Sequence, residues 1–222
     1  MTKLSPPEQG RARTADLTVH ALGVPLGALA AIVLIALTVW VRADDPAALL
    51  SVPLYAAALV AMLAFSAAYN MALRPTRRAW LRRVDHATIY VMIAGTYTPF
   101  MLIDVGGRLG AIFTMFVWAV ALLGAAVKLA WPHRFERLSI ALYLLLGWSV
   151  LAVLRPLLSA VDTVSIVLLL GGGLVYTVGV PIYLAKHFTY HRAAWHACVL
   201  AAALLHYAAV LRTVLVGAGH AA

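Results

Sequence analysis

The sequence has few charged residues and almost no cysteine. Only 11% of its 222 residues are Asp, Glu, Lys or Arg, whereas 64% are hydrophobic and the mean hydropathy is +0.93. Soluble domains carry about 25% charged residues, and one of this length could not bury so much apolar surface. The composition therefore predicts a membrane protein. The single cysteine, Cys198, excludes an internal disulfide framework.

Several sequence signatures of enzymes and nucleic-acid-binding proteins are also missing. There is no Gly-x-Ser-x-Gly or His-Glu-x-x-His motif, which argues against the hydrolase and protease classes that carry them. The Gly171–Gly173 triplet lacks the lysine of a phosphate loop and suits close helix packing instead. The net charge of +9 falls in gaps between apolar runs, so we expect membrane lipids and no nucleic acid as partners. The sequence sets no oligomeric state.

Seven uncharged runs dominate the chain. A hydrocarbon core about 30 Å thick needs about 20 helical residues, and flanking residues can extend the shorter runs. Backbone groups must be paired in lipid, so each run should be a helix. We predict an all-α integral membrane protein with a seven-transmembrane-helix bundle at 20–217, a cytoplasmic segment at 1–19 and an external tail at 218–222. The first run is too long for a signal peptide and should be retained. The runs are 21–41, 46–73, 87–103, 109–127, 138–154, 163–185 and 193–211.

The distribution of positive charge predicts the orientation. Thirteen of the 17 Lys and Arg residues lie before the first run or in alternate intervals after it. The other four, on the opposite side, are Arg42, Arg108, Arg155 and Arg212. Cytoplasmic segments of membrane proteins carry the excess of Lys and Arg. We therefore expect a cytoplasmic N-terminus, an external C-terminus and a location in the cell membrane, with the arginine-rich segment 74–83 as a cytoplasmic loop.

Polar residues gather at the predicted inner ends of four helices. Ionisable groups inside membrane spans are costly, so each is a candidate functional residue. Structural alternatives remain: Asp85 as a helix N-cap, an interfacial Asp16–His20 pair, hydrogen bonds between helices from Ser66 and Asn70, and a hydrogen-bonded bundle histidine at His206. The inner layer comprises Asp16, His20, Ser66, Asn70, Asp85, His86, Arg192 and His196.

The segment DHATIYVMIAGTYTPF, at 85–100, resembles the signature of the hemolysin III family, the bacterial branch of the progestin and adipoQ receptor (PAQR) superfamily. Segments 133–148, 171–186 and 195–207 match that family in the same order. The resemblance implies a seven-helix bundle with a zinc site at its cytoplasmic end. In it Ser66, Asp85 and His196 match family site residues, which makes Ser66 and Asp85 the catalytic candidates.

Two positions depart from the ligand set that the resemblance implies. Asn70 and Arg192 stand where the family has zinc-binding histidines. Asparagine is a poor zinc ligand and arginine cannot coordinate because it stays protonated. His191 could replace Arg192 only if the helix began later or bulged, because one residue turns a helix by about 100°. We therefore expect the family zinc site to be lost, with Asp85 paired to Arg192 and well under one zinc per chain.

Three functions remain open at this stage. The first is a non-enzymatic membrane protein of the hemolysin III type in membrane-lipid homeostasis or sensing, with a degenerate metal site. The second is a zinc-dependent lipid hydrolase that cleaves amides or esters, as the superfamily resemblance suggests. The third, a pore, is the least favoured, because a pore needs polar residues through the whole depth of the membrane.

Overall fold

Seven long apolar helices form the protein. The computed structural model describes residues 6–131 and 136–216, and these contain helices but no strand. Seven helical segments are long and apolar enough to cross a membrane, which confirms the predicted fold class. The orientation of the termini stays a prediction, and the tail at 218–222 and the first residues of segment 1–19 lie outside the described residues. The spans are Gly10–Val41, Pro46–Met71, Pro75–Val105, Gly107–Ala130, Leu138–Ala160, Thr163–Leu184 and His191–Val216.

Ten helical elements make up these spans. In chain order they are α1 (Pro6–Val41), α2 (Pro46–Met71), α3 (Pro75–Pro99), the π-helical η1 (Phe100–Val105), α4 (Gly107–Ala130), α5 (Glu136–Gly147), the 3₁₀-helical η2 (Trp148–Val153), α6 (Leu154–Ala160), α7 (Thr163–Leu184) and α8 (His191–Val216).

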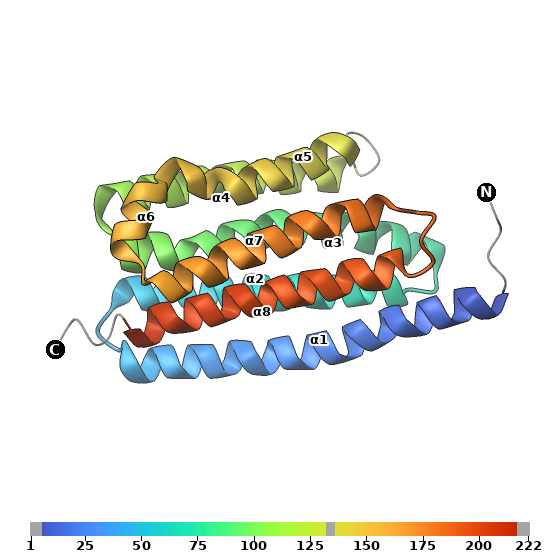
Figure 1. Cartoon of the computed structure of the whole chain (residues 1–222), viewed down its shortest axis with the longest axis horizontal. Coiled ribbons are helices and arrows are strands. Elements are labelled where there is room, and N and C mark those ends of the chain that lie inside the picture. Colours follow the sequence, from blue (N-terminus) through green and yellow to red (C-terminus); the bar gives the residue numbers. More distant parts are fainter. Residues whose placement is uncertain (1–5, 132–135, 217–222) are drawn as a thin grey trace.

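The helices pack as a ring in which most neighbours in sequence are neighbours in space. Helices α1 to α4 pack in succession, and α8 closes the ring by packing against both α7 and α1. Figure 1 shows α4 and α5 as one outer layer, with α3 and α7 beneath them. Helix α5 makes few contacts with α3, α4 or α7. The seam between α5 and α7 is therefore the loosest part of the bundle wall.

Two spans differ from the helices that the sequence predicts. The arginine-rich segment 74–83 is not a loop, because α3 begins at Pro75, whose fixed φ and missing N–H suit the first helical position. At the other end of α3, Pro99 lacks the N–H that would continue the α-helical ladder, and a π-helical turn follows at η1. The fifth span is also interrupted, since η2 separates α5 from α6.

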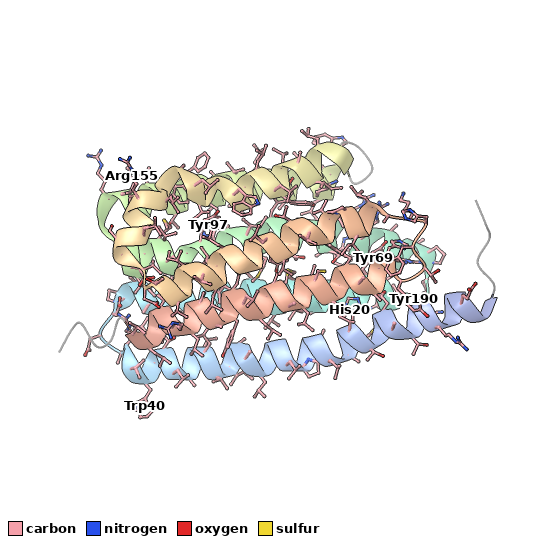
Figure 2. All side chains as sticks on the ribbon, viewed as in Figure 1. His20, Trp40, Tyr69, Tyr97, Arg155 and Tyr190 are labelled. Carbon is pink, nitrogen blue, oxygen red and sulfur yellow. The ribbon has the colours of Figure 1, made fainter. Side chains whose placement is uncertain are left out.

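Charged residues close the end of the bundle where α8 terminates. Arg42 donates to the backbone oxygens of Thr213 (2.8 Å) and Val214 (3.1 Å), which are among the last carbonyls of α8, and to Asp45 (3.0 Å). Thr213 in turn donates to Asp104 (2.9 Å). Trp40 and Arg155 mark this end in Figure 2. Helix ends leave orphan carbonyls, so Arg42 both satisfies α8 and ties it to α1 and α2.

Candidate functional site

A cavity of about 830 Å³ lies inside the helix ring, and residues of α1, α2, α3, α4, α5, α7 and α8, together with η1 and η2, line it. The polar residues from the inner layer lie at one end, and mainly apolar residues line the remainder. His20, Tyr69 and Tyr190 mark the polar end in Figure 2, at the opposite end of the bundle from Trp40 and Arg155. The lining reaches from Asp85 to Phe100 along α3, which corresponds to about 22 Å at 1.5 Å per residue.

The structure brings the predicted site residues into this one cavity. The lining includes Ser66 and Asn70 from α2, Asp85 and His86 from α3, and His191, Arg192, His196 and His206 from α8, together with His20 from α1. These polar groups lie near the last turns of α2 but near the beginning of α3 and α8. Because α2 runs in the opposite direction to α3 and α8, these helix ends lie at the same end of the bundle.

Asp16, His20 and His196 form a buried cluster between α1 and α8. His196 Nδ1 lies 2.5 Å from Asp16 Oδ1, and His20 Nε2 lies 3.8 Å from the same oxygen. The two imidazole rings lie 4.4 Å apart, centroid to centroid. Asp16 and His20 are only 8% and 6% exposed, so they are not an interfacial pair in water. Asp16 and His20 are four residues apart on one helix, which puts both on the face that meets α8.

A second set of polar contacts joins α2, α3 and α8. Arg192 donates to the side-chain oxygen of Asn70 (3.1 Å), and the Asn70 amide donates to the backbone oxygen of Ser66 (2.9 Å). The Ser66 side chain also hydrogen bonds to Asp85. The sequence predicted that Arg192 would pair directly with Asp85, but its hydrogen bond goes to Asn70, while its charge acts on Asp85 electrostatically.

The structure also decides between two alternatives for Asp85. Helix α3 begins ten residues before it, with Arg74 as the N-cap, so Asp85 does not cap the helix. It lies inside the span and faces the cavity. An acidic residue in that position keeps its status as a candidate functional group.

The remaining histidines have separate places. His206 Nε2 lies 3.1 Å from the backbone oxygen of Leu169, so it is a hydrogen-bonded bundle histidine that also lines the cavity. His191 is the first residue of α8, and its Nδ1 lies 2.8 Å from the Phe188 oxygen. His86 lines the cavity beside Asp85, and its backbone oxygen accepts a hydrogen bond from Tyr143 (2.9 Å).

The sequence analysis missed one residue of the cavity wall and one of the adjacent cluster. Lys128, which was interpreted only as an orientation signal, is 1% exposed and lines the cavity from α4. Asp16 was placed in the inner layer but not in the site, although its spacing to His20 was visible. A lysine near the end of an apolar run looks the same in the sequence whether its side chain points outward or inward. Its burial can therefore be recognised only in the packed structure.

The residues that could hold a metal differ from those of the family pattern. Within the described part of the chain, Asp16, His20 and His196 form a group whose ligand atoms all lie within 4.8 Å of one another. Neither Asn70 nor His191 belongs to this group. Arg192 and Asn70 hydrogen bond to each other, so the two positions at which the resemblance implies zinc-binding histidines do not fit a cation.

Comparison with known proteins agrees with this architecture. A family described as Haemolysin-III related matches residues 12–207. The chain is 30% identical to Hemolysin-3 of Bacillus cereus, over 90% of this chain and 91% of that protein. It is 39% identical to a Hemolysin-3 homolog of Bacillus subtilis (strain 168), over 59% of this chain and 62% of the relative. It is also 28% identical to the human Monocyte to macrophage differentiation factor, over 60% of this chain and 58% of that protein.

Proposed function

This chain belongs to the haemolysin III family of multi-pass membrane proteins, and we propose that it binds a membrane lipid inside its helix ring and acts in membrane-lipid homeostasis or sensing. The observation that carries the proposal is the cavity, which combines one polar end with a long apolar wall. Its volume of about 830 Å³ falls in the usual range of ligand sites, and such sites pair apolar walls with a few polar groups.

The chemistry of the polar end favours a head group that accepts hydrogen bonds. The guanidinium of Arg192 presents N–H donors there, and Lys128 adds a buried amino group at the wall. Guanidinium groups bind phosphate or carboxylate oxygens well, because their N–H groups match the spacing of those oxygens. An acyl chain would then lie along the apolar wall beside Met92 and Leu169.

The loose seam between α5 and α7 supports a lateral path from the membrane. Both helices line the cavity, and their direct packing against each other is sparse. The indole N–H of Trp148 bridges this seam with a hydrogen bond to Thr177 (3.0 Å). A lipid entering here would keep its tail in an apolar surrounding throughout.

Two glycines on α7 provide the test. Gly173 lines the cavity, and an added Cβ there would meet only the Trp148 ring, at 3.8 Å; Gly171 is outside the lining, and its Cβ would meet only Leu205, also at 3.8 Å. Gly173→Leu should therefore fill the cavity and release bound lipid, whereas Gly171→Leu is the matched control. Lipid retained after purification in mild detergent is measured by mass spectrometry. Equal retention by both variants and the parent would refute a lipid in this cavity.

A metal-dependent lipid hydrolase is the second candidate. The Ser66–Asp85 hydrogen bond next to the cluster around His196 favours it, because a carboxylate and a cation-binding group then face one cavity. A divalent cation at the cluster would supply Lewis-acid chemistry for amide or ester hydrolysis. Release of fatty acid from amide-linked and ester-linked lipids, abolished in Asp85→Asn, would establish it. A pore is disfavoured by the polar seal around Arg42 at the far end.

A further inference from the structure

We propose that Asp16, His20 and His196 bind one divalent transition-metal cation of the zinc type, so that α1 supplies ligands in place of the positions now held by Asn70 and Arg192. The proposal does not depend on lipid binding. It changes the expectation from the sequence, which considered α2, α3 and α8 alone and therefore found too few ligands.

The first argument is the unsatisfied nitrogen of His20. His20 is 6% exposed, and its Nε2 is buried without a hydrogen-bond partner among the described atoms. Buried polar atoms normally have partners, because leaving one unpaired costs about 1–3 kcal/mol. The nearest acidic oxygen, on Asp16, lies 3.8 Å away and is too far for a hydrogen bond. A cation bound between them would satisfy both atoms.

The second argument is the spacing of the ligand atoms. Zinc bonds of about 2.0–2.1 Å at tetrahedral angles put ligand atoms about 3.3 Å apart. Here the distances from Asp16 Oδ1 are 2.5 Å to His196 Nδ1 and 3.8 Å to His20 Nε2, which lie on either side of that value. Small side-chain rotations that open the first distance and shorten the second would reach the metal geometry. The carboxylate would then exchange its hydrogen bond to His196 for the metal.

The third argument is the chemistry of the donor set. Two imidazole nitrogens and one carboxylate oxygen suit zinc and neighbouring transition metals, whereas magnesium and calcium prefer oxygen ligands. Three protein ligands with one open position is also the usual pattern of catalytic zinc sites. The open position would face the cavity, because His20 and His196 line it and Asp16 does not.

The two departures from the family pattern are compatible with this site because they contact each other. The Arg192 guanidinium donates to the Asn70 side-chain oxygen at 3.1 Å, which holds the arginine in place, and its positive charge still acts on His20. The carboxylates of Asp16 and Asp85 oppose that charge in the same layer. The chain thus has a hydrogen-bonded pair, Asn70 and Arg192, where the resemblance implies two ligand histidines, and it has two potential ligands, Asp16 and His20, on α1.

Metal content tests the proposal directly. The full-length protein is purified without metal-chelate resin, incubated with Zn²⁺, desalted and analysed for zinc. We expect about one zinc per chain in the parent and a loss of about tenfold or more in His20→Ala and in His196→Ala. His206→Ala is the matched control, since His206 is another histidine of the cavity wall but lies outside the cluster, and this variant should retain the metal.

Two results would overturn the proposal. One is a parent protein that holds no more zinc than His20→Ala does. For this comparison both proteins need only be monodisperse on size exclusion. The other is zinc that survives in His20→Ala but disappears in His191→Ala, because the ligand would then be the first residue of α8. Bound lipid measured in the same samples separates failure of the metal site from failure of lipid binding.

Discussion

Replacing Arg42 by methionine should destabilise the protein strongly. The guanidinium makes hydrogen bonds of 2.8 Å and 3.1 Å to the Thr213 and Val214 oxygens and of 3.0 Å to Asp45, and its side chain is only 10% exposed. Methionine keeps the apolar stem but leaves the two α8 carbonyls without this donor. Asp45 loses less, since its other oxygen still caps α2 by accepting from Ala47 and Ala48.

The expected magnitude follows from those contacts. A hydrogen bond to a charged group contributes about 1.5–3 kcal/mol, so losing two at the end of α8 should cost about 3–6 kcal/mol. In a chain of this size that corresponds to a fall in Tm of roughly 6–24 °C. Thermal unfolding in detergent, followed by circular dichroism, measures it. Arg155→Met is the control, because Arg155 is exposed at the same end of the bundle. A Tm for Arg42→Met equal to that of Arg155→Met would refute the assigned role of Arg42.

Three further predictions test orientation, pH dependence and the altered ligand positions. Reporter fusions after Arg83 should read cytoplasmic and fusions after Asp104 external, and the opposite result would reverse the orientation inferred from charge. Burial opposes ionisation of Asp162, but hydrogen bonds from Ser165 and Arg212 outweigh it and lower the pKa of this carboxyl. Its stabilising effect is therefore fully present above the unfolded-state pKa of about 3.9 and is lost as pH falls from there through the lower folded-state pKa. Asp162→Asn should therefore lower Tm more at pH 7 than at pH 3, as thermal unfolding at both pH values can check. In the His20→Ala background, Asn70→His with Arg192→His should restore zinc binding, because the two new histidines and His196 would form a set of three ligands. If zinc analysis shows no uptake by this folded variant, the family geometry is absent for other reasons.

The sequence predicted the bundle well because lipid restricts the choices. Backbone groups in the hydrocarbon region must pair within their own segment, so an uncharged run of sufficient length has few alternatives to a helix. The errors lie where a local proline or tertiary packing decides. Pro75 begins α3 ahead of the apolar run, and η2 interrupts the fifth span although its residues are as apolar as those around it.

The candidate site could be predicted only as a layer. Depth along a helix follows from residue counting, which placed Asp85, Arg192 and His196 at one level. Direction around the helix axis depends on which neighbours pack against each face. That is why Asp16 and Lys128 were assigned no site role from sequence, and why the structure gives Arg192 a partner other than Asp85.

The contact between Asn70 and Arg192 changes how the two departures from the family pattern are interpreted. Considered singly, each substitution removes a metal ligand, and together they indicate a site in decay. The residues are 122 positions apart, but their side chains meet at 3.1 Å, so an amide at one position gives a partner to the cation at the other. A half-buried arginine inside a membrane span is costly without such a partner. The pair therefore needs to be tested together, because Arg192→His alone leaves Asn70 without its donor and Asn70→His alone places an imidazole against a guanidinium.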